Sequence, residues 1–258
     1  MNKFTSILRR HRGFLGSVAL VLAVALIFWA VNSPALVGAA ASTRELPIYN
    51  VQRDNKAVSL TFDAAWGNED TQELIDILNS YGVKATFFLV GEWVDKYPES
   101  VKQLYDAGME IANHSDSHPH MSKLSDKEIM NEVTLCNEKI EAITGEAVKL
   151  FRCPYGEYDD NVISTINNMG IDVIQWNVDS LDWKDLSAED IYVRVTSNVV
   201  PGSIVLFHNA ALHTPEALAD IIEYLLSEGY EIVPVSELLL TGEYEIDHAG
   251  MMISKESA

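Results

Sequence analysis

Cysteine is scarce in this chain, since only Cys136 and Cys153 occur among its 258 residues. Two cysteines cannot form a disulfide framework, and the sequence alone does not say whether they pair. Their spacing excludes the Cys-x-x-Cys pairs of a structural zinc ribbon. No Gly-x-Gly-x-x-Gly follows a predicted strand, which argues against a dinucleotide-binding fold. The sequence also has no internal repeat and no low-complexity segment.

Basic residues are few as well. The chain has 18 Lys and Arg against 38 Asp and Glu, a formal net charge of -20. Nucleic-acid phosphates would repel such a surface, so no nucleic-acid partner is expected. Hydrophobic residues make up 48% of the chain, which is enough for one domain of ordinary size with a sizeable core. Nothing in the composition indicates an obligate protein partner.

The N-terminus has the pattern of a membrane signal-anchor. Four basic residues, Lys3, Arg9, Arg10 and Arg12, precede an uncharged and mostly apolar stretch over residues 13–31. A helix needs roughly 20 residues to span a bilayer, which this stretch nearly provides. Because basic residues stay on the cytoplasmic side, we expect residues 1–12 in the cytoplasm and the remaining chain outside it.

This pattern predicts a single-pass protein of the cell membrane. The small residues around Ala41 offer an alternative, because cleavage there would release a secreted protein. Export without a disulfide framework indicates a bacterial surface. We expect a linker over residues 32–54, one folded domain over residues 55–240, and a polar, partly disordered tail over residues 241–258.

Short apolar runs alternate with longer amphipathic stretches through the folded domain. Helix starts are marked by Ser125–Glu128 and Ser187–Asp190, which have the pattern of capping boxes, by Thr214 as an N-cap, and by Pro98. The predicted strands are Ala57–Phe62, Ala85–Val90, Met109–Ala112, Val148–Phe151, Asp172–Trp176, Ser203–Phe207 and Glu231–Val235. Strict alternation predicts an α/β fold, a closed or nearly closed parallel (β/α) barrel, with an open doubly wound sheet as the alternative.

Two histidines spaced four apart, His114 and His118, directly follow the predicted strand Met109–Ala112. If that segment turns helically, both side chains lie on one face. Two neutral imidazoles can bind one metal ion, and a metal in an open site lowers the pKa of bound water from about 15.7 to about 7. The pair therefore indicates a hydrolase. The alternative is a polar loop whose histidines bind nothing.

Other reactive side chains follow further predicted strands. They are Asp63, Arg152, Asp179 with Asp182, and His208. In a parallel barrel these strand ends share one face, where active sites form. By chemical type, Asp63 is the candidate base and His208 the candidate acid. Asp179 or Asp182 could hold the imidazole, and Arg152 could keep Asp63 ionised. Three of these residues also have a structural alternative. Asp63 could cap the next helix, Arg152 could belong to a structural ion pair, and His208 could be a core histidine.

Five segments containing these residues together resemble a known family. They are Thr61-Phe62-Asp63, His114-Ser115-Asp116-Ser117-His118, Arg152-Cys153-Pro154-Tyr155, Asp179-Ser180-Leu181-Asp182-Trp183 and Val205-Leu206-Phe207-His208. In this order they resemble the motifs of the polysaccharide deacetylases, also called the NodB-homology domain or family-four carbohydrate esterases. The match runs from about Lys56 to Val235. It implies a distorted parallel (β/α) barrel that removes acetyl groups from polymers such as peptidoglycan and chitin, using a divalent metal.

The resemblance implies a role at each matching position. Zinc is the expected metal. The implied roles are Asp63 as catalytic base, His114 and His118 as metal ligands, Arg152 as the residue that orients the base, the backbone amide of Tyr155 as an oxyanion donor, Asp179 as the aspartate that tunes the acid, His208 as the acid, and Trp183 with Leu206 as lining of the acetyl pocket.

One position departs from the family pattern. The family usually has a second aspartate directly after the base, as the third metal ligand, and this chain has Ala64 there. Catalytic zinc usually has three protein ligands, so a substitute is needed. Asp116 could supply it if its side chain turns inward, as could Asn113 or Asn68, although we expect Asp116 to be a solvated loop residue. A milder departure is Asn209, where an aspartate is common. The run from Ala64 to Gly67 resembles a variant subfamily linked to sporulation.

Three functions are therefore open. The first is a metal-dependent N-deacetylase acting on cell-wall polysaccharide. The second is a catalytically impaired pseudoenzyme that binds glycans through aromatic side chains such as Trp66, Trp93, Tyr155 and Trp183. The third is a barrel glycosidase with paired carboxylates, which leaves the histidine pair without a task. We expect the first.

Overall fold

The protein is described by a computed structural model that covers residues 44–255. The predicted cytoplasmic segment, the anchor over residues 13–31 and the cleavage site near Ala41 lie outside the described residues. Within residues 44–255, no helix combines the length and the apolar character needed to cross a bilayer. Glu45–Ala258 groups as one compact unit, which contains every predicted site residue.

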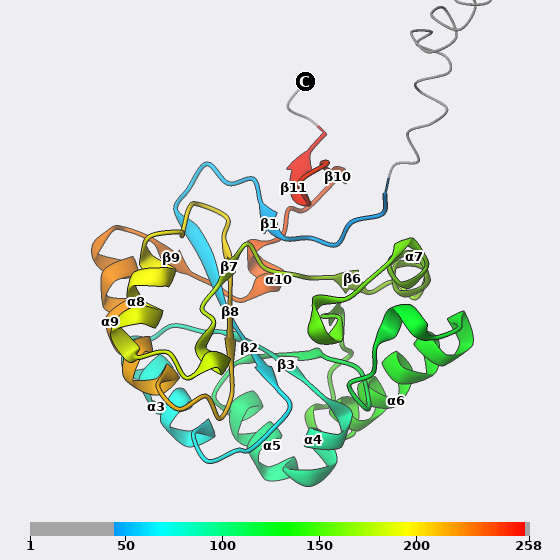
Figure 1. Cartoon of the computed structure of the whole chain (residues 1–258), viewed down its shortest axis with the longest axis horizontal. Helices are drawn as coiled ribbons and strands as arrows, with labels where there is room; N and C mark the ends of the chain where they lie inside the picture. The colour runs from blue at the N-terminus through cyan, green and yellow to red at the C-terminus, as the bar shows by residue number, and fades with distance from the viewer. Residues whose placement is uncertain (1–43, 256–258) are drawn as a thin grey trace, which may run out of the picture. The chain divides into compact units, whose positions relative to one another are not determined.

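A curled parallel sheet forms the centre of this unit (Figure 1). Its strand order is β6-β5-β4-β3-β2-β8-β7, with β9 paired to β2, and neighbouring strands run parallel. The strands are β2 Ala57–Ala64, β3 Thr86–Leu89, β4 Glu110–Asn113, β5 Leu150–Phe151, β6 Asp172–Val173, β7 Val178–Asp179, β8 Ile204–His208 and β9 Glu231–Ile232. Each predicted strand overlaps one of these. The sheet ends at β6 and β7, so it is a half-barrel rather than a closed one.

Helices pack outside the curled sheet (Figure 1). They are α3 Thr71–Ser80, α4 Gly91–Lys96, α5 Pro98–Asp106, α6 Asp126–Thr144, α7 Asp160–Asn168, α8 Ala188–Thr196, α9 Thr214–Ser227 and α10 Val235–Leu238. The capping box of Ser125 and Glu128 opens α6, and Pro98 opens α5, as the sequence predicts. At α9 the prediction was wrong, because the N-cap is His213.

Segments that we expected to be linker and tail form a second sheet. Its strands are β1 Asn50–Val51, β11 Met251–Ser254 and β10 Tyr244–Ile246, in that order. The disorder expected after Thr241 is therefore corrected, since residues 244–254 carry two paired strands. β1 pairs Asn50 with Met251, far along the sequence, so no local pattern reveals this pairing.

The segment around β1 also bridges the opening of the half-barrel. Ile48 exchanges backbone hydrogen bonds with Val173 (2.8 Å) and Gln175 (2.7 Å), at the end of β6. Three residues later, the Val51 amide donates to the carbonyl of Gly202, just before β8. Buried residues of this segment, α10 and β11 share one core cluster. The segment around β1, α10 and β11 therefore pack together against the sheet, away from the carboxyl ends of its strands.

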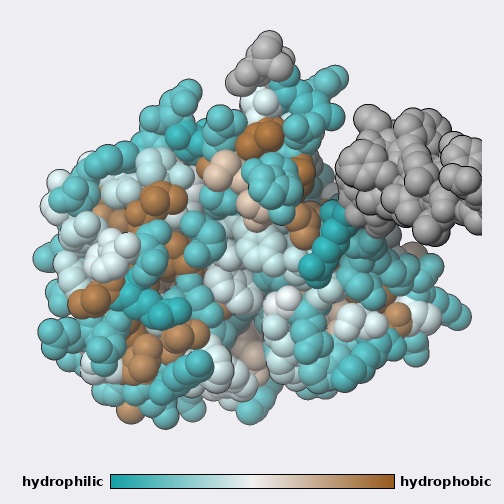
Figure 2. All heavy atoms as spheres, turned by 45° about the horizontal axis from the view of Figure 1, so that its top comes forward, coloured by the Kyte–Doolittle hydropathy of each residue, from teal (hydrophilic) through white to brown (hydrophobic). Residues whose placement is uncertain are grey.

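Residues of β2 alternate between two environments, as a pleated strand requires. Leu60, Phe62 and Ala64 belong to the large core cluster that the sheet shares with the outer helices. Thr61 and Asp63 face the barrel interior instead. Outside the core, hydrophilic residues cover much of the surface, with several hydrophobic patches between them (Figure 2). The strand alternation decides which side chains reach the site.

Candidate active site

A cavity of roughly 480 Å³ opens at the carboxyl ends of the strands. It brings together most of the residues that the sequence predicted. Its lining consists of Asp63, Ala65, Trp66, His114, His118, Tyr155, Gly156, Trp176, Asp179, Trp183, Leu206 and His208. Parallel strands deliver these residues to one edge of the sheet, which is why residues up to 145 positions apart meet here.

Asp63 lies at the centre of a buried charge network. Its Oδ1 accepts a hydrogen bond of 2.7 Å from Nη1 of Arg152, which is fully buried. Its Oδ2 lies 3.4 Å from Nε2 of His114. The guanidinium of Arg152 packs 4.0 Å from the ring centroid of Phe88 and donates to the carbonyl of Gln175. The structure therefore brings the guanidinium of Arg152 into direct contact with the carboxylate of Asp63, while its role in orienting a base stays a prediction.

The network sets the ionisation of Asp63. Burial alone would raise its pKa, but the charge of Arg152, with further contributions from His114 and His208, lowers the pKa below its usual value. Burial lowers the pKa of His114, although Asp63 opposes this. At neutral pH Asp63 is therefore a carboxylate and His114 a neutral imidazole. These are the ionisation states that a base and a metal-binding histidine require.

The two histidines converge, but not on a helix. Ser115 and His118 both have left-handed backbones, with φ of 68° and 57°, so the condition of a helical turn is not met. The rings of His114 and His118 still meet edge to face, with centroids 4.9 Å apart. Glu132 on α6 holds the loop, since it accepts from the amides of Asp116 and Ser117 and from the Ser117 hydroxyl. Burial lowers the pKa of His118 to about 4.

The proposed substitutes for a third metal ligand all point elsewhere. Asp116 Oδ1 forms an ion pair of 2.6 Å with Lys139 on α6. Asn113 donates to Val133 and Asn137, and Asn68 donates to Ser100. Among residues 44–255, no three His, Cys, Asp or Glu side chains form a set that could hold a metal ion. Asp116, which the sequence offers only as a possible third ligand, is thus paired with Lys139 instead.

Of the two alanines that follow Asp63, Ala65 rather than Ala64 lines the cavity. Ala64 is the last residue of β2 and lies in the core cluster under the outer helices, with 1% of its surface exposed. Ala65 lines the cavity together with His114 and His118. Neither methyl group can bind a metal. Two imidazoles without a third side-chain ligand do not fit a three-ligand catalytic zinc site.

Asp182, not Asp179, holds the imidazole of His208. Its Oδ1 lies 2.8 Å from Nδ1 of His208, and its Oδ2 accepts from the His208 amide (2.8 Å) and the Thr214 hydroxyl (2.7 Å). Asp179 lines the cavity, but its carboxylate accepts from the amide of Leu181. Of the two aspartates that the sequence leaves open for this contact, the structure therefore shows Asp182, while the family resemblance had implied Asp179. Leu181, which lies between the two aspartates and directly precedes Asp182, has a left-handed backbone (φ 54°).

This arrangement favours the protonated form of His208. Burial opposes the charge, but the hydrogen bond and charge of Asp182, with Asp63 and Asp179 nearby, raise the pKa of His208 above its ordinary value. Asp63 and His208 are register partners on the neighbouring strands β2 and β8. The cavity thus contains a carboxylate whose pKa is lowered and an imidazole whose pKa is raised, which is the usual state of a base and an acid.

Aromatic side chains surround this pair. Trp66, Tyr155 and Trp183 are exposed to 53%, 58% and 50% and line the cavity, and Leu206 lies among them. Tyr155 has φ of 59°, a backbone conformation that is costly for a residue with a side chain. Trp93 was also considered for glycan stacking, but it is buried and donates to the carbonyl of Gly67.

Sequence reasoning missed several contributors to the site. Thr214 was predicted as a helix cap, yet its hydroxyl fixes Asp182. Trp176 lines the cavity and lies 5.5 Å from the Arg152 guanidinium, although it was assigned only to a strand. Asn209 received no role, and it binds the loop that carries Trp66. Of these three residues, only Asn209 could have been linked to the site from the sequence, because it directly follows His208.

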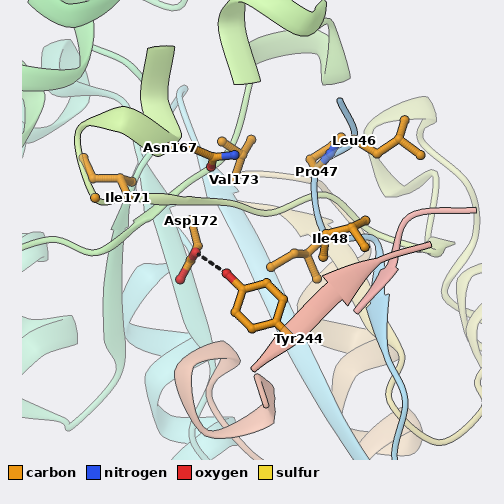
Figure 3. Close-up of a pocket in the computed structure, with 10 residues that line it drawn as sticks. Leu46, Pro47, Ile48, Asn167, Ile171, Asp172, Val173 and Tyr244 are labelled. Atoms are coloured by element: carbon orange, nitrogen blue, oxygen red, sulfur yellow. Dashed lines mark hydrogen bonds between the residues drawn. The ribbon is translucent and has the colours of Figure 1, made fainter. Parts of the chain in front are cut away.

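A second cavity, of roughly 320 Å³, lies away from these residues (Figure 3). It is formed where residues 46–48 meet β6 and β10, and it is lined mainly by apolar side chains. There Tyr244 points toward Asp172, with its hydroxyl 3.4 Å from Oδ1 (Figure 3). Burial raises the pKa of Asp172, and the hydrogen bond from Tyr244 opposes this. No residue predicted for catalysis lines this cavity.

Comparison with known proteins agrees with the geometry. The family model described as polysaccharide deacetylase matches residues 50–174. A peptidoglycan-N-acetylglucosamine deacetylase of Bacillus cereus is 36% identical over 73% of this chain and 70% of its own length. The peptidoglycan-N-acetylmuramic acid deacetylase PdaC of Bacillus subtilis is also 36% identical, but the chain spans only 40% of its length. The structure of BA3943, a CE4 family pseudoenzyme from Bacillus anthracis, aligns with a TM-score of 0.72 at 38% identity, covering 74% of this chain and 68% of that one.

Proposed function

The chain belongs to the polysaccharide deacetylase family, and on that premise we propose that it removes N-acetyl groups from the amino sugars of peptidoglycan. One observation carries the proposal: Asp63 and His208 line one cavity from adjacent strands, and their surroundings shift their pKa values in opposite directions. Such a pair can act as base and acid on the same substrate.

The chemistry assigned to the pair is hydrolysis of an amide bond. A water molecule attacks the acetyl carbon, and Asp63 accepts its proton as the new C–O bond forms. His208 then donates a proton to the sugar nitrogen as the C–N bond breaks, which leaves acetate and a free amine. We assign the backbone amide of Tyr155 to the oxyanion that develops on the carbonyl oxygen. Trp183 and Leu206 would enclose the acetyl methyl group.

We assign no step of this hydrolysis to a metal ion. Members of the family are generally metal-dependent, and a bound divalent ion would activate water for attack. His114 and His118 are the residues that would hold such an ion, and among residues 44–255 no third His, Cys, Asp or Glu side chain joins them. Water would have to complete the coordination, so any ion would be bound more weakly than by three protein ligands.

The substrate class comes from the relatives. Named relatives act on N-acetylglucosamine or N-acetylmuramic acid residues of peptidoglycan. Aromatic side chains at the rim of the cavity could stack on the rings of such sugars. We place the domain outside the cell membrane, held by the predicted anchor over residues 13–31, because its polymer substrate lies there.

The test is acetate release by the purified full chain. Metal is removed first, and peptidoglycan and N-acetylglucosamine oligomers are then supplied with and without added zinc or cobalt. We expect acetate without chain cleavage, and its loss in Asp63→Asn and His208→Gln. Release of shorter glycans instead of acetate would favour a glycosidase. No acetate under any condition, with Asp63→Asn behaving like the native chain, would refute the proposal.

A second function is favoured by a specific observation, which is that alanine occupies both positions after the base, Ala64 and Ala65. In this case the chain would bind glycans without hydrolysing them. One structural neighbour is itself named a pseudoenzyme. Calorimetric titration with N-acetylglucosamine oligomers decides between the two, since binding without acetate release from any substrate supports the second function.

A further inference from the structure

Trp66 lies face to face with His208 at the edge of the cavity. The two ring centroids are 5.5 Å apart, and the ring planes differ by 23°. Asp182 binds the imidazole at Nδ1, along its edge, whereas Trp66 covers one of its faces. Because the indole is half-exposed, this contact is not imposed by burial in a crowded core. The contact needs a separate explanation.

The loop carrying Trp66 is fastened to the residue that follows His208. The side-chain oxygen of Asn209 accepts from the amide of Ala65 (3.1 Å), and its nitrogen donates to the carbonyl of Gly67. These bonds flank Trp66 on both sides. An aspartate could not donate to the Gly67 carbonyl, so this arrangement requires the amide. Asn209 is itself buried and bonded through its backbone to the carbonyl of Asp63.

An aromatic face in this position acts on one protonation state only. The negative face of an indole attracts a cation within about 6 Å and does little for a neutral imidazole. The other groups facing His208 are the carboxylates of Asp182, Asp63 and Asp179, which also favour its charged form. His114 and His118 oppose it when they are protonated. Trp66 therefore adds to the effect of the carboxylates on the protonated imidazole, because it contacts a face of the ring whereas Asp182 contacts its edge.

We propose that Trp66 is a positioning residue for His208, holding the imidazole plane and stabilising its protonated form by stacking. The proposal rests on the proposed function, in which His208 is the acid. Trp66 itself transfers no proton and needs no contact with substrate. Its role differs from that of a sugar-stacking platform, which would act on substrate affinity and leave the titration of His208 alone.

The direct test is NMR titration of His208 in the full chain without substrate. His208→Gln identifies the resonance. Trp66→Leu removes the aromatic face, and Trp66→Phe keeps a smaller one. The matched control is Trp183→Leu. Trp183 is exposed to a similar extent and lines the same cavity, but its ring does not stack on His208 as that of Trp66 does. We expect the His208 pKa to fall by about 0.5 to 1 in Trp66→Leu, by less in Trp66→Phe, and by under about 0.2 in the control.

An unchanged His208 pKa in Trp66→Leu, or an equal fall in Trp183→Leu, would overturn the proposal. The titration uses no substrate, so its outcome does not depend on whether the chain hydrolyses glycans. In the acetate assay, the alkaline limb of the rate profile should move to lower pH in Trp66→Leu, with the same shift as the NMR pKa. A raised KM with an unmoved pH profile would instead assign Trp66 to sugar binding and refute the positioning role.

Discussion

Asp182 binds His208 at two points, through the ring nitrogen Nδ1 and through the backbone amide, each at 2.8 Å. The same carboxylate also accepts from Thr214 and from the amide of Trp183. All four partners are donors, so both oxygens of Asp182 are needed as acceptors. This geometry fixes the tautomer of His208 with its Nε2 available to the cavity, as an acid requires.

Replacing Asp182 by asparagine should impair the acid. An amide would place its NH₂ group against one pair of donors, and the negative charge that favours the imidazolium would be lost. We expect the His208 pKa to fall and kcat near neutral pH to drop by about tenfold to a hundredfold, since charge-assisted hydrogen bonds contribute about 1.5–3 kcal/mol. Asp179→Asn is the control, because Asp179 does not touch the imidazole. A larger effect of Asp179→Asn on the His208 titration would contradict the assignment.

The raised pKa of His208 also predicts how stability depends on pH. A histidine that binds its proton more tightly in the folded state stabilises that state fully below its unfolded pKa of about 6.5. This contribution is lost as the pH rises through the folded pKa. The free energy of unfolding of the native chain minus that of His208→Gln should therefore decrease above about pH 6.5. Urea unfolding at several pH values measures it, and a difference that grows with pH would show that burial outweighs Asp182.

Arg152 and Asp63 should be strongly coupled. Arg152→Met leaves Asp63 buried without its cation, and breaking a buried pair costs about 3–5 kcal/mol. The pKa of Asp63 should then rise, because burial would no longer be offset, and the acidic limb of the rate profile should move to higher pH.

A thermodynamic cycle checks this coupling. The double variant Arg152→Met with Asp63→Asn removes both charges and should be less destabilised than the sum of the two single variants. Additive changes in the free energy of unfolding would mean that Arg152 serves packing against Phe88 rather than the charge of Asp63.

A carboxylate at position 65 should create a better metal site than one at position 64. Ala65 lines the cavity with both histidines, so Ala65→Asp can supply a third donor. Ala64 belongs to the apolar core, so Ala64→Asp buries a charge and should lower stability by several kcal/mol. Calorimetric titration with zinc should show at least about tenfold tighter binding in Ala65→Asp than in the native chain. Ala65→Asn controls for size, and tighter binding in Ala64→Asp alone would reverse the assignment.

The two cysteines should remain reduced thiols that react only after unfolding. Cys136 and Cys153 are both free and buried, and burial raises the pKa of each thiol. A thiol reagent should therefore label neither residue in the native chain and both in denaturant. The midpoint of thermal unfolding should not change on adding a reducing agent, whereas a lowered midpoint would indicate a disulfide.

Much of the fold follows from local patterns. Alternating strands and helices predict the parallel sheet because each apolar run must be covered by the next amphipathic stretch. The order of reactive residues at the strand ends predicts one shared site, because parallel strands end at the same edge. Asp63, Arg152, His114, His118 and His208 were found in this way. Helix starts such as Ser125 with Glu128 were predicted because capping satisfies backbone groups within four residues.

The tertiary structure decided the partners of those residues. Asp182 rather than Asp179 contacts His208, and the Leu181 before it has a left-handed backbone. A leucine gives no indication of that conformation in the sequence. Asp116 forms an ion pair with Lys139, and Ala65 rather than Ala64 lines the cavity, because strand alternation turns Ala64 into the core beneath the outer helices. Sequence determines which chemical groups arrive at an edge of the sheet. The direction in which each group points depends on turns and distant packing partners, and only the folded chain brings those together.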